Sequence, residues 1–235
     1  MGARPAPLRL QPMGDQALLV LFGERIDAEL NDQVHQLAAL IRGAGLPGVT
    51  DLVPAYASLA VHYEPGPWAE RGQPFAVLGA ELNRLWAGAA RAPAPAPRRV
   101  RIPVCYGGAF GPDLAEVARH CRLSEAELVA RHSGAEYRVY MLGFAPGFAY
   151  LGGLDPALAA PRRPTPRLKV PPGSVGIAGP QTGIYPLETP GGWQIIGRSP
   201  LRLFDPGQAA PCLLNPGDRL EFFPIAPDAF QAEQP

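Results

Sequence analysis

The sequence predicts an α+β protein: a small N-terminal α+β sandwich followed by a C-terminal domain built as a β-barrel or β-sandwich. Three observations carry this prediction. An alternating Ala-Pro segment lies near residue 90, helix and strand periodicities precede it, and short β-type runs among dense glycine and proline follow it. The chain of 235 residues is long enough for two domains of ordinary size.

The Ala-Pro segment covers residues 89–97 (AARAPAPAP) and separates the two predicted domains. Alternating alanine and proline favour an extended spacer, because proline lacks an amide donor and clashes with the preceding turn of a helix. We therefore expect an N-terminal domain over residues 1–88, a linker over 89–97, a C-terminal domain over 98–226 and a tail over 227–235.

The N-terminal domain alternates strand and helix patterns. An apolar run at 17–22 predicts a strand, and apolar residues at helical spacing over 26–41 predict an amphipathic helix. Runs at 49–53 and 58–63 predict two more strands, and a second helix carries apolar residues over 75–86. The order of these patterns favours an antiparallel sheet with its helices on one side.

The C-terminal domain opens with a strand pattern at 99–105 and two short helices. Ser124 and Glu127 have the spacing of a capping box at the start of the second helix. After that helix the pattern becomes that of a barrel or sandwich with large loops, and we expect residues 143–192 to form ordered, functional loops. The β-type runs lie at 137–142, 192–197 and 220–223.

The charge balance argues against nucleic acid and membranes as partners. Lys and Arg total 21, as do Asp and Glu, so no strong global field attracts a polyanion. No apolar run reaches the roughly 20 residues of a membrane helix, and the N-terminus lacks a signal-peptide core, so we expect a cytoplasmic protein. The three cysteines lack the spacing of a disulfide framework or a metal site, and we expect no metal.

Four blocks gather residues that could bind a small anionic ligand. They are a glycine-aromatic block at 143–153, an arginine-proline block at 162–167, a polar block at 179–186 and a glycine-tryptophan block at 189–198. Stiff loops lose little entropy on binding, glycine lets backbone amides approach a ligand, and arginine forks match carboxylate or phosphate. Alternatively, the arginines cover a solvated face and glycine and proline only turn the chain.

The same blocks resemble the B-subunit family of bacterial 5-oxoprolinase, also called KipI-like or allophanate hydrolase subunit 1. The resemblance is carried by HSGAEYRVYML at 132–142, GFAPGFAYLGGLDP at 143–156 and PRRPTPRLKVPPGSVGIAGPQTGIYPLETPGGWQIIGRSPLRLFDP at 161–206. It extends more weakly to the N-terminal domain through residues 14–20 and 54–59.

This resemblance implies a cyclophilin-like β-barrel at the C-terminus and work beside two 5-oxoprolinase partners, a carboxyltransferase-like C subunit and an A subunit. Such a complex converts 5-oxo-L-proline to L-glutamate with ATP hydrolysis. ATP is then bound by the complex, not necessarily by this chain, and the chain alone is expected to be inactive. Two alternatives are a histidine-kinase inhibitor, which acts as a binding module, and a carboxyltransferase-like subunit of urea or allophanate metabolism.

The ligand-facing residues are expected in the second and third blocks. As hypotheses, Arg167 neutralises a substrate carboxylate or a phosphate, and Gln181 and Thr182 orient that group by hydrogen bonds. Tyr185 is placed beside them. Tyr150, together with other aromatic residues of the blocks, could wall a pocket or contact a partner protein.

Three further residues have two interpretations each. Arg162 and Arg198 could bind the same anion, or could pair with the acidic residues Asp155, Glu188 or Asp205. His132 could act as an acid or base, or could be a buried structural residue. The sequence does not decide between these interpretations.

Overall fold

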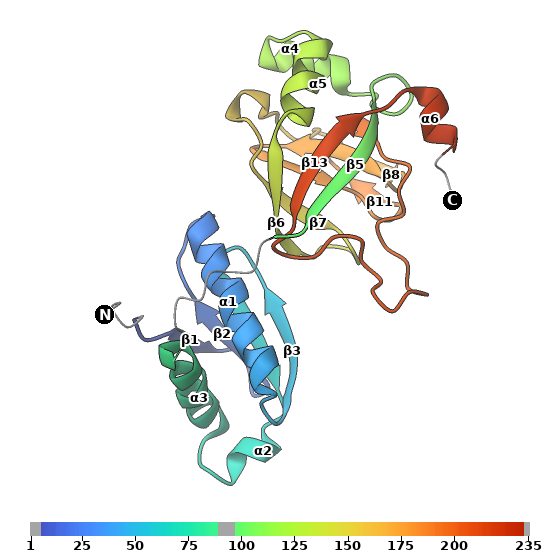
Figure 1. Cartoon of the computed structure of the whole chain (residues 1–235). Coiled ribbons are helices and arrows are strands. Elements are labelled where there is room, and N and C mark those ends of the chain that lie inside the picture. The colour runs from blue at the N-terminus through green and yellow to red at the C-terminus, as the bar shows by residue number, and fades with distance from the viewer. Residues whose placement is uncertain (1–5, 89–96, 233–235) are drawn as a thin grey trace. The chain divides into compact units, whose positions relative to one another are not determined.

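A computed structural model describes residues 6–88 and 97–232. The chain divides into two compact units, Met1–Ala96 and Pro97–Pro235, each with its own core (Figure 1). The predicted linker, apart from Pro97, lies outside the described residues. Each unit is described separately below.

The N-terminal unit is built on a four-stranded antiparallel sheet in the order β1-β2-β4-β3. The strands are β1 (Arg9–Pro12), β2 (Ala17–Leu21), β3 (Val49–Pro54) and β4 (Ser58–Tyr63). In β4, buried and half-buried residues alternate, so one face of the sheet is directed into the core. This arrangement confirms the α+β class predicted for the N-terminal part.

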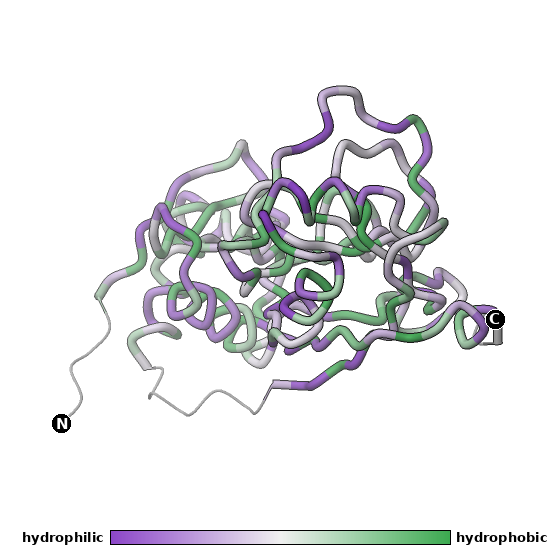
Figure 2. Tube along the Cα trace, turned by 90° about the horizontal axis from the view of Figure 1, so that it is seen from above, coloured by the Kyte–Doolittle hydropathy of each residue, from purple (hydrophilic) through white to green (hydrophobic). Residues whose placement is uncertain are grey.

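The helices of this unit are α1 (Ala28–Ala44), α2 (Gly66–Ala69) and α3 (Pro74–Gly88). Asp27 caps α1 by accepting hydrogen bonds from the amides of Glu29 and Leu30, and Gly45 ends the helix in the left-handed conformation. Purple and green alternate along the helical coils in Figure 2, as expected of amphipathic helices. The apolar faces of α1 and α3 share one core with β2 and β4.

The C-terminal unit is a closed seven-stranded barrel in the order β10-β7-β6-β13-β5-β12-β9. Its strands are β5 (Arg99–Tyr106), β6 (Glu136–Leu142), β7 (Ala149–Gly152), β9 (Ser174–Ala178), β10 (Gln181–Ile184), β12 (Gln194–Arg198) and β13 (Arg219–Pro224). The first and last strands, β5 and β13, pair in parallel and lie side by side in Figure 1. A separate two-stranded antiparallel sheet pairs β8 (Arg167–Val170) with β11 (Thr189–Gly191). The barrel confirms the fold predicted for this domain.

Two helices, α4 (Leu114–Cys121) and α5 (Glu125–Ser133), pack against β12 and β13 respectively. The capping box predicted at Ser124 and Glu127 is present, with both reciprocal hydrogen bonds formed. The segment expected to be a tail instead begins with helix α6 (Pro227–Ala232). This helix is ordered because Phe230 is buried, with its ring 4.5 Å from that of Phe110.

Residues 143–192, expected to be loops, contain β7 to β11 and a short 3₁₀ helix, η1 (Pro156–Leu158). These strands are only three to five residues long. All five residues of β9 are buried, so the strand lacks the alternating pattern by which a half-exposed strand is recognised. Strands this short and this buried leave little periodic signal in the sequence.

Within residues 6–88 and 97–232, no helix is long and apolar enough to cross a membrane. Nor do three or more His, Cys, Asp or Glu side chains gather there in an arrangement that could hold a metal ion.

Candidate functional site

The site is organised by the barrel wall made of β7, β10 and β9. In β10 and β9, Thr182 pairs with Ile177 and Gly183 pairs with Gly176. Because side chains alternate along a strand, Thr182 and Ile177 point into the barrel while the two glycines lie on the opposite side. We call these the inner face and the outer face of the wall.

The paired glycines form a flat floor on the outer face. A Cβ atom at Gly183 would lie 3.1 Å from the Trp193 ring and 3.2 Å from the Phe148 ring, and one at Gly176 would lie 3.2 Å from Trp193. Only glycine lets the two aromatic rings approach the strands this closely.

Phe148 is the centre of an aromatic group above this floor. Its ring meets those of Tyr150, Tyr185 and Trp193 edge to face, with centroids 5.1, 5.5 and 5.7 Å apart. With Val170, Ala178 and Ile195 these rings form a small core of their own, separate from the barrel interior. We call this set the outer aromatic cluster.

Tyr185 lies in the outer aromatic cluster with 2% of its surface exposed. Burial raises the pKa of its phenol, an effect opposed by a hydrogen bond from the Trp193 backbone amide and by the charges of Arg162 and Arg167. A side chain at Gly191 would collide with the Tyr185 hydroxyl, so glycine is required above it. The phenol therefore lies within the electrostatic reach of two arginines.

Asp113, just before α4, holds the arginine block in place. Its carboxylate accepts hydrogen bonds from both terminal nitrogens of Arg167 at 2.8 Å, from Arg163 Nη1 at 2.9 Å and from the Ile195 amide at 2.6 Å. The Asp113 side chain is 4% exposed, and that of Arg167 is 24% exposed. A buried carboxylate with this many charge-assisted bonds fixes its partners firmly.

The arginine block keeps a positive charge despite Asp113. Arg162, Arg163 and Arg167 contribute three positive charges against one negative charge, which leaves an excess of two. Arg162 is exposed, and within the described part of the chain it has no ion-pair partner. The Arg163 amide donates to the Gly192 carbonyl at 2.7 Å, so the block lies against the glycine-tryptophan block. Such a surface can receive a carboxylate or a phosphate.

Three buried polar atoms of this region find no hydrogen-bond partner among the described residues. They are Arg163 Nε, Thr189 Oγ1 and Gln194 Oε1. Buried polar atoms nearly always have a hydrogen-bond partner in folded proteins. Unpaired ones close to the arginine block therefore mark this region as a candidate site.

His132 lies on the inner face, fully buried at the end of α5. Thr182 donates its hydroxyl hydrogen to the Gly176 carbonyl, so His132 Nε2 is the donor to Thr182 Oγ1 at 3.0 Å, and Nδ1 accepts from the Tyr106 hydroxyl at 2.8 Å. Burial lowers the pKa of His132 to about 3. The neutral ring stacks on Phe222 with centroids 4.8 Å apart. These contacts favour the structural interpretation of His132 over the acid–base one.

The structure separates the other residues expected to act together. Gln181 and Thr182 are neighbours in β10 and therefore point to opposite faces, with Thr182 fully buried beside His132. The joint role hypothesised for them is thus incompatible with the strand. The sequence had suggested a loop here, in which neighbouring side chains can converge.

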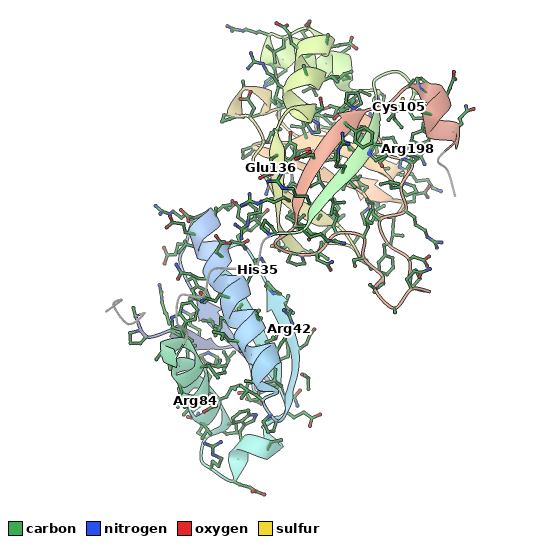
Figure 3. All side chains as sticks on the ribbon, in the orientation of Figure 1. His35, Arg42, Arg84, Cys105, Glu136 and Arg198 are labelled. Carbon is green, nitrogen blue, oxygen red and sulfur yellow. The ribbon has the colours of Figure 1, made fainter. Side chains whose placement is uncertain are left out.

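Arg198 makes its contacts with residues outside the arginine block. Its Nε donates to the Pro172 carbonyl at 2.8 Å, and its guanidinium lies over the Phe230 ring, 5.6 Å from the ring centroid. Figure 3 labels Arg198 on the same side of the barrel as α6. The acidic partners considered for Arg162 and Arg198 pair elsewhere: Asp155 with Arg131, Glu188 with Lys169 and Asp205 with Arg202.

Phe144 projects from a strained turn at the edge of the outer aromatic cluster. The Ala145 amide donates to the Gly143 carbonyl at 2.9 Å across a three-residue turn, and Phe144 has a φ of 71°. Its ring packs against Phe148 yet remains 67% exposed. Strain of this kind is found preferentially at functional sites.

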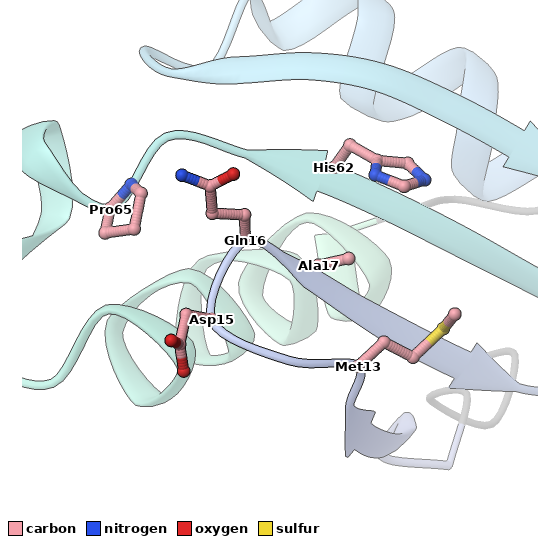
Figure 4. A pocket seen from close by; sticks show the side chains of 6 residues that line it. All are labelled: Met13, Asp15, Gln16, Ala17, His62 and Pro65. Carbon is pink, nitrogen blue, oxygen red and sulfur yellow. The ribbon is translucent and has the colours of Figure 1, made fainter.

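The N-terminal unit has a shallow hollow of about 440 Å³ lined by Asp15, Gln16 and His62, among others (Figure 4). It contains no arginine or lysine in its lining. Its polar groups do not converge as those of the arginine block do, so we place the candidate site in the C-terminal unit.

Sequence reasoning included Arg163 only as a member of the arginine-proline block, without a role of its own, and missed Asp113 as part of the site. Asp113 follows Gly-Pro and precedes a helix, which is the sequence of an ordinary N-cap. Its side chain makes no capping bond, however, and turns to the arginines instead. In the structure, a side chain at Gly111 would collide with the Ile196 carbonyl, and the Asp113 amide donates to the Ile195 carbonyl at 2.9 Å, so Asp113 lies beside β12.

Comparison with known proteins supports the resemblance. Residues 8–214 match the family described as "Carboxyltransferase domain, subdomain C and D". The chain is 44% identical over 229 residues to the 5-oxoprolinase B subunit of Bacillus subtilis (strain 168), covering 95% of each chain.

Solved structures give the same picture of the fold. A crystal structure of TTHA0988 matches 90% of this chain at 42% identity and a TM-score of 0.77, and this chain spans 40% of that longer chain. The K. lactis urea amidolyase matches 96% of this chain at a TM-score of 0.71, and this chain spans 15% of it. At 18% identity that second likeness shows the fold alone. By its sequence over nearly its whole length, the chain belongs to the B-subunit family of 5-oxoprolinase, within the carboxyltransferase subdomain C and D family.

Proposed function

We propose that this chain is the B subunit of an ATP-dependent 5-oxoprolinase, which opens 5-oxo-L-proline to L-glutamate together with its C and A subunits. The observation that carries the proposal is the positively charged arginine block, fixed by Asp113 beside the outer aromatic cluster, in a chain 44% identical to a 5-oxoprolinase B subunit.

The chemistry of the substrate suits this surface. 5-Oxoproline is a five-membered lactam bearing a carboxylate, so it needs a cation for the carboxylate and an apolar contact for the ring. Guanidinium groups match a carboxylate in a bidentate manner, and aromatic side chains offer flat apolar contacts. We assign the carboxylate to Arg162 of the arginine block and the ring to the half-buried Tyr150, with Gln181 on the same face. Tyr185, by contrast, is too buried to touch the ligand and supports the aromatic rings from below.

ATP hydrolysis fits the reaction because an unstrained lactam is a poor electrophile. Phosphorylation of the amide oxygen would convert it into a better one. The chain has no Gly-Lys-Ser/Thr sequence for a P-loop, whereas its arginine block could receive a phosphate as readily as a carboxylate. We therefore propose that the assembled complex binds ATP, with this chain contributing at most arginines.

The need for partner proteins follows from what the candidate site lacks. His132 is buried on the inner face, so it is out of reach of a ligand held at the arginine block on the outer face. Tyr185 is also buried, and burial raises its pKa. We propose that a partner protein of the complex supplies the acid or base and completes the pocket, and that the chain alone is inactive.

The test is reconstitution. The chain is co-expressed with its partner proteins, and release of inorganic phosphate is measured with 5-oxo-L-proline, urea or allophanate as substrate. Phosphate release that depends on 5-oxoproline and on every protein of the complex is the expected result. Release with urea or allophanate in its place would favour the carboxyltransferase alternative. Absence of release with all three, combined with tight binding to a histidine kinase, would favour the inhibitor alternative.

A further inference from the structure

We propose that Asp113 is a positioning residue whose carboxylate fixes Arg163 and Arg167, and that Arg162 is the guanidinium that receives the anionic group of the ligand. This division of roles rests on the proposed function, because it assigns tasks within the same candidate site. It differs from the sequence-based hypothesis, in which Arg167 contacts the anion.

Asp113 is itself held by two hydrogen bonds to Ile195. Its backbone amide donates to the Ile195 carbonyl at 2.9 Å, and the Ile195 amide donates back to its carboxylate at 2.6 Å. Ile195 belongs to the outer aromatic cluster. The carboxylate is therefore tied to the outer aromatic cluster, beside which the ligand ring would rest, and not to the helix that begins next to it.

The three arginines of the block differ in what remains available to a ligand. Arg167 gives its end-on fork, formed by both terminal nitrogens, to Asp113, so that fork is not available to a second carboxylate. Arg163 gives Nη1 to Asp113 and its backbone amide to Gly192. Arg162 precedes them, is exposed and has no ion-pair partner in the described part of the chain. Its charge also reaches the Tyr185 phenol.

Asp113 has an electrostatic task as well. Its negative charge offsets one of the two positive charges beside it, which makes Arg163 and Arg167 less attractive to an incoming anion. If the carboxylate becomes an amide, both guanidiniums are released and the local excess of positive charge rises by one. An anion should then bind more tightly but in the wrong place, so affinity and turnover should change in opposite directions. A residue needed only for folding would not produce that split.

The experiment compares Asp113→Asn, Asp113→Glu and Arg162→Gln with the matched control Arg131→Gln, which removes another exposed arginine of the same domain. Calorimetry on the full chain measures binding of inorganic phosphate and of 5-oxo-L-proline, and steady-state kinetics on the reconstituted complex gives kcat and KM. Melting temperatures report on folding.

Arg162→Gln should weaken the binding of both probes about tenfold or more, as expected when a charge-assisted bidentate contact is lost. It should raise KM while changing kcat much less. Asp113→Asn should bind phosphate about threefold more tightly and lower kcat about tenfold or more, since misplacement of a substrate is costly. Asp113→Glu should recover part of kcat, and Arg131→Gln should resemble the wild type.

Two results would overturn the proposal. Loss of phosphate affinity, turnover and melting temperature together in Asp113→Asn would reduce that residue to a structural one. A wild-type KM in Arg162→Gln would remove Arg162 from the anion contact. If the wild-type complex releases no phosphate with 5-oxoproline, the proposed function fails, but phosphate binding to the chain still decides how Asp113 and Arg162 divide their roles.

Discussion

The two faces of one barrel wall differ in whether their polar groups have hydrogen-bonding and ion-pair partners. On the inner face, His132 and Thr182 satisfy each other and are closed off by aromatic rings. On the outer face, Arg163 and Arg167 share one carboxylate while Arg162 has no ion-pair partner among the described residues, and nearby polar atoms such as Gln194 Oε1 have no hydrogen-bond partner there. A satisfied, neutral cluster stabilises a fold, whereas a charged and incompletely satisfied one is suited to a ligand. Burial alone does not identify a site; unused hydrogen-bonding capacity does.

Removing a ring from the inner face should have the largest effect on stability. Phe222 is 1% exposed and contacts His132 and Tyr137, so Phe222→Ala should lower the free energy of unfolding by about 3–5 kcal/mol. Phe144→Ala, at an exposed ring of the outer face, should change it by less than about 0.5 kcal/mol. Urea titration of both variants measures the difference. Equal losses would show that the outer face is packed as tightly as the inner one.

The buried histidine should make stability depend on pH. The pKa of His132 is about 3 in the folded chain and near 6.5 when unfolded, so between these values only the unfolded chain binds the proton. The stability that comes from the neutral ring is complete above pH 6.5. As the pH falls from 6.5 towards 3, protonation of this histidine in the unfolded chain should lower the free energy of unfolding by about 1.4 kcal/mol per pH unit.

His132→Asn should lack that component of the pH dependence. Urea titrations of the wild type and the variant at pH 7, 6 and 5 isolate it, because all other ionisable groups are common to both proteins. Parallel pH profiles would mean that the histidine is charged or solvated in the folded state, and would reopen its acid–base interpretation.

A side chain added to the glycine floor of the outer face should cause the next largest loss of stability. A methyl group at Gly183 would press on the Trp193 and Phe148 rings, so Gly183→Ala should lower the free energy of unfolding by about 1–3 kcal/mol. Gly43→Ala in α1, where no atom lies within 4 Å of the added group, should raise it by several tenths of a kcal/mol. Thermal unfolding of both variants tests the contrast. A neutral Gly183→Ala would show that the rings do not rest on the strands.

The exposed ion pair of the small sheet should have the smallest effect. Lys169 lies 3.0 Å from Glu188, but the two side chains are 77% and 53% exposed. Lys169→Gln should therefore change stability by less than about 0.5 kcal/mol, and added salt should remove even that difference. A larger, salt-resistant loss in a urea titration would mean that this pair helps to anchor β8 and its arginine.

The sequence was sufficient to predict the helices and strands that have strong local signals. The helix ending at Gly45, the capping box at Ser124 and the strand beginning near Arg99 all depend on residues within a few positions of one another. The site depends instead on contacts distant in sequence: Asp113 meets Arg163 and Arg167 across more than forty residues. No spacing rule predicts such a contact, because it exists only once the barrel has closed.

The register of β10 places Gln181 and Thr182 on opposite faces of the barrel wall, which the sequence alone did not reveal. Gln181 and Thr182 stand in a segment of glycine, proline and polar residues that resembles a loop, and only the pairing with β9 reveals which of them points inward. A shift by one residue would have exchanged their faces, so composition could not assign their roles.

The parallel pairing of β5 with β13 has a consequence for biosynthesis. Arg99 pairs with Arg219, so the seam of the barrel joins the beginning of the domain to its end. A contact between such distant positions forms slowly, since the intervening chain must first be ordered. The barrel therefore cannot close on the ribosome until its final strand has been translated, and a nascent chain arrested before that strand would expose two open edges to aggregation.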